Sequence, residues 1–270
     1  MELFDLIKAI ILGFIEGMTE FAPVSSTGHL IIVDDMWLQT NILLGDKAAI
    51  TFKIVIQLGS ILAVFLVFWK RILSLLGFNK NITSHLNLLH VVIALLPATV
   101  LGLTFKDYID KLFKIETVIV ALIIGAVLMM FADKLGPEKS KVVSLDQITY
   151  KQAFMIGIIQ CLSLWPGFSR SGATISGGVL LGMNHKVAAD FTFIMAVPIM
   201  IGASSVSIVK NWEYLSFDYL GFYTAGFISS FAFSLISIRF FLKIISRIKL
   251  TPFAIYRIIL AIILVFMLYM

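Results

Sequence analysis

The stretch EGMTEFAPVSSTGH, residues 16–29, interrupts an apolar N-terminal segment that otherwise has the composition of a membrane helix. IKAIILGFI precedes it and LIIV follows it. The stretch combines two glutamates, a run of three hydroxyl side chains, a glycine and a histidine at a depth where ionisable groups are costly. Non-helical backbone persists at membrane depth only where protein surrounds it or where it lines a wet cavity. We therefore predict a re-entrant helical hairpin with this stretch at its buried tip.

The composition places the rest of the chain in the membrane as well. Of the 270 residues, 60% are hydrophobic and 14% are charged, and the mean hydropathy is +1.01. Soluble domains are about 45–50% apolar and ~25% charged. The net charge of +5 does not indicate nucleic-acid binding, because the basic residues lie in short loops beside apolar runs, where they set topology. Cys161 stands alone, so no disulfide framework is expected.

Six segments are long and apolar enough to cross ~30 Å of hydrocarbon as helices. They lie at about 50–69, 86–105, 116–132, 188–209, 219–240 and 253–270. No polar stretch between them is long enough to fold alone, and the acidic N-terminus is predicted to be retained rather than cleaved as a signal peptide. We predict an all-α polytopic membrane protein with residues 1–270 in a single membrane domain.

Residues 150–187 repeat the pattern of residues 1–48, an apolar helix, a polar tip and a second apolar helix. An offset of 144 places AIILGFIEGMTEFAPVSSTGH over AFMIGIIQCLSLWPGFSRSGA, with identities at Ala9/Ala153, Gly13/Gly157, Ile15/Ile159, Ser25/Ser169 and Gly28/Gly172. Three predicted spans follow each hairpin, so the second half enters from the opposite face. This arrangement is an inverted repeat, about 1–133 and about 150–270, with six full spans and two re-entrant hairpins.

The charges of the loops predict the orientation. Loops 70–85, 133–151 and 239–249 are basic and share one side of the membrane in this arrangement. The loops near 106–115 and 210–218 are mixed in sign. The positive-inside rule makes the first set cytoplasmic and places the N-terminus outside. The two hairpins then enter from opposite faces, and their tips meet near the midplane.

Glu16 and Glu20 are four residues apart and share one face of a helix. One interpretation is structural, with one glutamate protonated or the pair neutralised by a nearby base. The other is a carboxylate pair that holds a divalent cation such as Mg²⁺ or positions a water molecule. Ionisable groups inside a membrane are functional by default, which favours the second interpretation.

Both tips have the chemistry of helix N-termini. The residues concerned are Ser25, Ser26, Thr27 and Gly28 in the first tip, and Ser169, Ser171 and Gly172 in the second. A helix start offers free N–H groups and the positive end of a dipole, which favour an anion. Simple capping of two half-helices accounts for Ser25 and Ser169 equally well.

Arg170 and His29 supply the remaining chemistry. A buried guanidinium costs at least ~2.5–3.5 kcal/mol at a helix centre and needs anionic partners. Its planar fork suits phosphate, and a structural salt bridge to Glu16 or Glu20 is the alternative. His29 is either a hydrogen-bonded core residue or an acid–base group. Together the two tips predict a phosphate or pyrophosphate site within the membrane.

EGMTEFAPVSSTGH and PGFSRSGAT resemble, in this order, the two signature motifs of the bacterial undecaprenyl-diphosphate phosphatase family of the bacitracin-resistance type. The resemblance extends over essentially the whole chain, including IQLGSILAVF at 56–65 and AADFTFIMAVP at 188–198. It implies a hydrolase of the bacterial plasma (inner) membrane. Such an enzyme removes the terminal phosphate of a C55 isoprenoid diphosphate and regenerates the monophosphate carrier for cell-wall synthesis.

The resemblance also implies roles for individual residues. Glu16 and Glu20 are the acidic pair associated with a divalent cation, Mg²⁺ or Ca²⁺. Ser26 and His29 are catalytic candidates, and Arg170 is the phosphate clamp. The residues expected to line the substrate site are Ser25, Thr27, Gly28, Ser169, Ser171 and Thr174. The expected partners are the lipid substrate, the bilayer and a second copy in a homodimer, without nucleic acid.

Two alternatives stay open at this point. The nucleophile is either Ser26, activated by His29, or a water molecule oriented by His29 or a glutamate. The protein is either the phosphatase or a transporter, such as a lipid-phosphate flippase. Broken helices and inverted repeats are typical of transporters, and a transporter of a lipid phosphate needs the same anion site.

Overall fold

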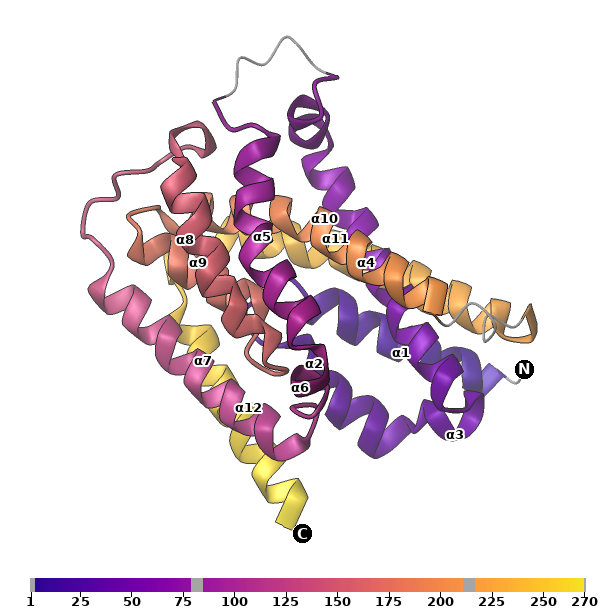
Figure 1. Ribbon diagram of the computed structural model, residues 1–270. Coiled ribbons are helices and arrows are strands. Elements are labelled where there is room, and N and C mark those ends of the chain that lie inside the picture. The colour runs from indigo at the N-terminus through magenta and orange to yellow at the C-terminus, as the bar shows by residue number, and fades with distance from the viewer. Residues whose placement is uncertain (1–2, 79–84, 211–216, 270) are drawn as a thin grey trace.

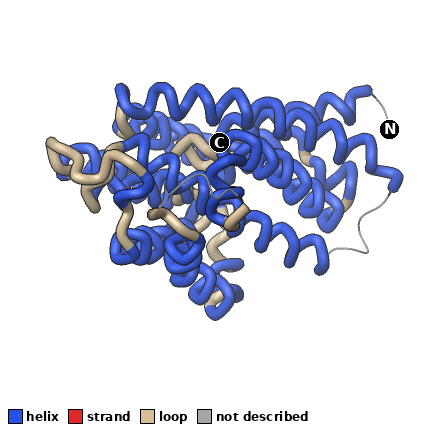
Figure 2. Tube along the Cα trace, turned by 90° about the horizontal axis from the view of Figure 1, so that it is seen from above, coloured by secondary structure: helices blue, strands red, loops and turns tan. Residues whose placement is uncertain are grey.

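The computed structural model describes residues 3–78, 85–210 and 217–269, and its regular elements are helices (Figures 1 and 2). The first half of the chain contains α1 (Leu3–Thr19), α2 (Ser26–Leu30), a π-helix (Ile31–Leu38), α3 (Thr40–Leu44), α4 (Asp46–Leu75), α5 (Leu88–Thr104), α6 (Lys106–Asp110) and α7 (Ile115–Leu135). The second half contains α8 (Tyr150–Gln160), a 3₁₀ turn (Cys161–Leu164), α9 (Arg170–Leu180), α10 (His185–Lys210), α11 (Leu220–Ile248) and α12 (Thr251–Tyr269), with short 3₁₀ turns at Leu145–Gln147 and Phe217–Tyr219.

Each predicted span coincides with one helix. Within the described residues, five helices are long and apolar enough to cross a membrane, namely α4, α7, α10, α11 and α12. The predicted span at 86–105 forms α5, which is apolar but has only 17 residues. The all-helical, multi-pass character expected from the composition is therefore confirmed.

Two of the predicted loops, 70–85 and 239–249, begin with helix instead, because α4 continues to Leu75 and α11 to Ile248. In the second of these, the chain reverses only at Lys249, whose φ is 57°. The basic residues of this segment extend the helix, because long Lys and Arg side chains reach water while their stems cover apolar surface. The predicted loops 70–85 and 210–218 include residues 79–84 and 211–216, which lie outside the described residues.

Each polar tip lies between two helical pieces. α1 leads into the first tip and α2 leaves it, and α8 and α9 flank the second tip in the same way. α1 packs on α11, and α8 packs on α5 (Figure 1). Small residues allow these close approaches, since Gly13 faces the backbone of α11 at Gly226 and Gly157 faces the backbone of α5 at Ala94.

The packing of α1 gives a stability prediction. Gly13→Ala places a Cβ atom against the carbonyl oxygen of Gly226, and overpacking of this kind costs about 1–3 kcal/mol. We expect a lower thermal unfolding midpoint in detergent. Gly202→Ala is the matched control, because no atom lies within 4 Å of a Cβ at that position. Equal midpoints for the two variants would show that α1 and α11 do not need this contact.

Asp133 joins the ends of three helices. Its Oδ2 atom accepts hydrogen bonds from the backbone N–H groups of Leu250 and Thr251 at 2.9 and 2.7 Å and from the Thr251 hydroxyl at 2.6 Å. Its Oδ1 atom lies 2.7 Å from His185 Nε2. These bonds satisfy the free donors at the start of α12 and fix α12 against α7 and α10.

Candidate active site

A cavity of about 330 Å³ lies between the two tips and is lined by both. Its polar lining includes charged, hydroxyl and amide side chains, namely those of Glu20, Ser25, Ser26, Thr27, Gln57, Ser163, Ser169 and Arg170. Two segments about 144 residues apart thus meet, as the sequence predicted for the two hairpins. A larger groove of about 810 Å³ runs along α7 and α12, but its lining is mostly apolar.

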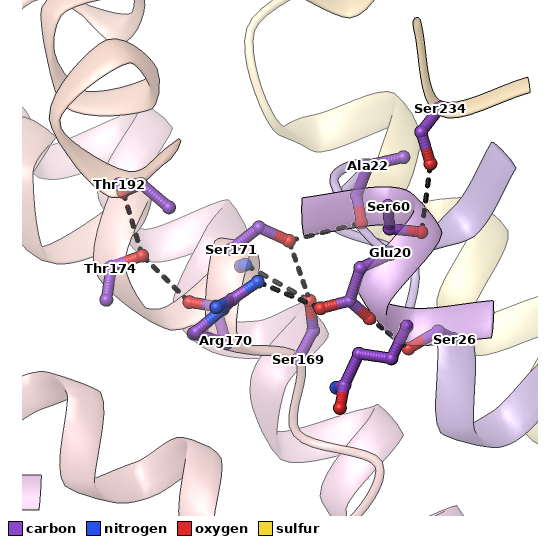
Figure 3. A network of polar contacts seen from close by, with 12 residues as sticks. Glu20, Ala22, Ser26, Ser60, Ser169, Arg170, Ser171, Thr174, Thr192 and Ser234 are labelled. Atoms are coloured by element: carbon purple, nitrogen blue, oxygen red, sulfur yellow. Dashed lines mark hydrogen bonds and ion pairs between the residues drawn. The ribbon is translucent and has the colours of Figure 1, made fainter. Parts of the chain in front are cut away.

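Glu20 is the centre of this site (Figure 3). The Ser26 hydroxyl donates to Glu20 Oε2 at 2.7 Å, and Arg170 Nη2 donates to Glu20 Oε1 at 2.8 Å. The carboxylate therefore contacts the hydroxyl of one tip and the guanidinium of the other. The Arg170 and Glu20 side chains are 15% and 12% exposed, so the ion pair is largely shielded from solvent. Of the two alternatives that the sequence left open for Arg170, the structure has the salt bridge to Glu20.

The two tips have the same local backbone. Ser25 and Ser169 both adopt positive φ, 72° and 71°, a region that non-glycine residues rarely occupy. Each is an N-cap, with its hydroxyl accepting from Gly28 N–H at 3.3 Å or from Gly172 N–H at 3.1 Å. The capping predictions for both serines are confirmed. Strain of this type is found mainly where the surrounding structure imposes a functional geometry.

Hydroxyl groups connect the second tip to its surroundings. The Ser171 hydroxyl donates to the carbonyl oxygen of Ala22 at 3.1 Å and lies 3.1 Å from the Ser169 hydroxyl, so it bridges the tips (Figure 3). The Thr174 hydroxyl donates to the Arg170 carbonyl oxygen at 2.8 Å and accepts from Thr192 at 2.8 Å. Thr174 thus holds the backbone of Arg170, and neither Ser171 nor Thr174 lines the cavity.

His29 lies behind the first tip rather than beside Ser26. Its Nδ1 atom is 2.7 Å from the Ser25 carbonyl oxygen and its Nε2 atom is 2.7 Å from the Tyr256 hydroxyl. A carbonyl oxygen only accepts, so Nδ1 carries a proton, and in the neutral ring Nε2 accepts from Tyr256. Both nitrogens are engaged, and the hydroxyl of Ser26 points to Glu20 instead. The structure does not bring His29 and Ser26 together.

Glu16 lies one helical turn before Glu20, as the spacing predicted. The Glu20 N–H group donates to the Glu16 carbonyl oxygen at 2.9 Å. The Glu16 side chain is buried and does not line the cavity, and neither does Gly28. Among the described residues, no group of three or more His, Cys, Asp or Glu side chains is placed to hold a metal ion.

Two residues near the site were missed by sequence reasoning. Tyr256 contacts His29, and Arg257 donates to the carbonyl oxygen of Gly167 in the second tip at 3.0 Å. Both lie in the apolar segment 253–270, which was interpreted only as a span. The sequence contained a sign of the role of Arg257, which is the one charged residue in the sequence of α12. A charged residue inside a membrane span usually indicates a functional site.

Comparison with known families agrees with this geometry. Residues 9–263 match the family described as "Bacitracin resistance protein BacA". The chain belongs to the BacA family. An "Undecaprenyl-diphosphatase" of Exiguobacterium sibiricum is 66% identical, with 100% of both chains covered. Relatives with the same description from Geobacillus kaustophilus and Bacillus subtilis are 59% and 58% identical, with 99% and 98% of each chain covered. The family resemblance seen in the two motifs is therefore confirmed over the whole chain.

Proposed function

We propose that this BacA-family protein is a membrane phosphatase that hydrolyses undecaprenyl diphosphate to undecaprenyl phosphate and inorganic phosphate. The observation that carries the proposal is the Ser26–Glu20–Arg170 group at the meeting point of two capped tips. It combines a nucleophile, a base and a phosphate-binding cation in one cavity. The three relatives above, which cover nearly the whole chain, are described as undecaprenyl-diphosphatases. Recycling of the lipid carrier and bacitracin resistance follow from that reaction.

Phosphoryl transfer depends mainly on positioning and charge stabilisation. In our mechanism the diphosphate enters the cavity, and Arg170 transfers its hydrogen bond from Glu20 to the terminal phosphate. Helix starts favour anions, and α2 and α9 both begin at the tips that line the cavity. The negatively charged terminal phosphate then replaces the Glu20 carboxylate as the counter-ion of Arg170.

Ser26 is the proposed nucleophile and Glu20 its base, because a nucleophile and a base within hydrogen-bond distance are the recognisable pair of covalent catalysis. The Ser26 oxygen forms a bond to the terminal phosphorus while the bond from that phosphorus to the bridging oxygen breaks. The Ser26 proton passes to Glu20 and from there to the departing undecaprenyl phosphate, which leaves Glu20 ionised again. Water then attacks the phosphorus of the phosphoserine while Glu20 takes a proton from it, and the bond between the Ser26 oxygen and phosphorus breaks. Glu20 returns this proton to the Ser26 oxygen, and inorganic phosphate leaves. His29, which was a candidate base, instead holds the Ser25 carbonyl oxygen.

We propose that a divalent cation binds at this site with ligands from both the protein and the substrate. Mg²⁺ is commonly held by one or two carboxylates plus substrate phosphates. Glu20 would be its ligand, with Glu16 one turn behind, and the diphosphate oxygens would complete the set. Such an ion would neutralise charge on the phosphates.

The proposed architecture is an inverted repeat of two re-entrant hairpins and six spans in the bacterial plasma membrane. Two observations support it. The aligned Ser25 and Ser169 have matching backbone angles and matching caps. The aligned Gly13 and Gly157 pack on α11 and α5, which occupy equivalent positions in the two halves. α5 would be the shortest of the six spans. A homodimer stays a prediction from the sequence resemblance.

Phosphate release separates the phosphatase from a flippase or another transporter with the same anion site. We expect purified protein in detergent, with no gradient, to release inorganic phosphate from C55 diphosphate. A chelator is expected to lower the rate at least about tenfold, since bound metal neutralises substrate charge, and added Mg²⁺ or Ca²⁺ to restore it. Binding of the lipid without release of phosphate would favour the transporter. Phosphate release that a chelator leaves unchanged would show that the reaction needs no metal.

A further inference from the structure

Arg257, in the middle of α12, is wholly buried. Its Nη2 atom donates to the carbonyl oxygens of Ala121 at 3.2 Å and Gly167 at 3.0 Å. Its Nη1 atom lies 3.6 Å from the sulfur of Met129. None of the ion pairs found within residues 3–78, 85–210 and 217–269 includes Arg257. A buried cation without a carboxylate partner is costly, so its retention calls for a function.

The neighbouring helices leave room for this side chain. A Cβ atom on Gly125 of α7 would collide with the Arg257 guanidinium, and one on Gly172 of α9 would lie 2.9 Å from its Nη1 atom. The guanidinium therefore lies directly behind the start of α9, between α7 and the second tip. Gly167, whose carbonyl oxygen it binds, lines the cavity and lies three residues before Arg170.

The preceding residue, Tyr256, serves the other tip. Its hydroxyl lies 2.7 Å from His29 Nε2, and the two rings are stacked with an interplanar angle of 6°. His29 in turn holds the carbonyl oxygen of Ser25, the residue before Ser26. Successive residues of a helix point in directions about 100° apart. Two adjacent positions of α12 therefore reach the two tips separately.

We propose that Tyr256 and Arg257 are positioning residues that tie both tips to one rigid helix, α12, and so set the distance between Ser26 and Arg170. This inference deepens the proposed function and rests on it. Tyr256 acts through His29 on the first tip, and Arg257 acts through the Gly167 carbonyl on the second. Asp133 anchors the start of α12, so the position of the helix along its axis is also fixed.

The test compares Arg257→Met and Tyr256→Phe with the control variants Arg247→Met and Tyr108→Phe, whose parent side chains are exposed. A small displacement of reacting groups costs about 100-fold in rate. We expect kcat to fall about 100-fold in Arg257→Met and about tenfold in Tyr256→Phe, with KM changed less than about threefold. Arg257→Lys keeps the charge and one donating nitrogen, and it is expected to recover part of the loss. The controls keep the kcat of the wild type.

Hydrogen exchange measured by mass spectrometry gives a readout besides activity. We expect faster exchange at residues 165–172 in Arg257→Met and at residues 20–28 in Tyr256→Phe, and no change in the controls. If the wild type releases no phosphate, the proposed function fails, and exchange alone decides the positioning. Unchanged exchange and kcat in folded Arg257→Met overturn the inference. If Arg257→Met does not fold, Tyr256→Phe, which loses a single hydroxyl, decides the test. Unchanged exchange and unchanged kcat in Tyr256→Phe then overturn the inference.

Discussion

Replacing Arg170 by alanine is expected to lower kcat for phosphate release about 10³-fold, the smaller end of the effect of an arginine that stabilises a transferring phosphoryl group. The reason is geometric as well as electrostatic. Among the described residues, Arg170 is the positively charged residue that lines the cavity. It already contacts Glu20, whose carboxylate accepts from Ser26. Arg170→Lys keeps a charge without the planar fork, so it is expected to recover only a minor part of the rate.

The Arg170 variant needs a control for stability. Removing one partner of a shielded ion pair leaves the other charge unpaired, which destabilises a protein by itself. The double variant Arg170→Ala/Glu20→Gln removes both charges and is expected to regain thermal stability without regaining activity. Arg239→Ala, an exposed arginine of α11, controls for the loss of a surface charge. Wild-type kcat in folded Arg170→Ala would contradict the phosphate-clamp role.

Much of the fold follows from local rules that the sequence displays. Long apolar runs must form helices in a membrane because every backbone polar group needs a partner there. The tips were recognisable because ionisable and hydroxyl residues interrupt those runs. Positive φ at Ser25 and Ser169 was not recognisable. Serine gives no sign of that conformation, which the neighbouring packing imposes.

The site was predicted less completely than the fold, and the reason is its long-range contacts. The sequence indicated that Arg170 needs an anion, and Glu20 was one of the partners considered. The pairing of His29 with Tyr256 spans 227 residues, and no local pattern reveals it. Arg257 is different, because a lone charge in an apolar run was visible in the sequence. Its partners are carbonyl oxygens, which every residue has and which no sequence pattern distinguishes.

Ser26→Ala is expected to lower the rate of phosphate release at least about 10³-fold, since it removes the atom proposed to attack phosphorus. The substitution deletes one hydroxyl, whose hydrogen bond is the 2.7 Å contact with Glu20 Oε2. The fold is expected to survive, because the N-cap of α2 is the preceding residue, Ser25. Ser246→Ala is the matched control, because it removes an exposed serine hydroxyl of α11 outside the cavity, and it is expected to keep the activity of the wild type.

Two outcomes of the serine experiment separate the mechanisms. Acid quenching of the wild type during turnover, and of His29→Ala, should leave phosphate on the peptide that contains Ser26 if the intermediate is covalent. A folded Ser26→Ala protein with near-normal turnover would eliminate the covalent route. Glu20 would then have to orient a water molecule, and Glu20→Gln would abolish release while Ser26→Ala does not. The Ser26–Glu20 contact is common to both routes, so the relative losses of these two variants identify the nucleophile.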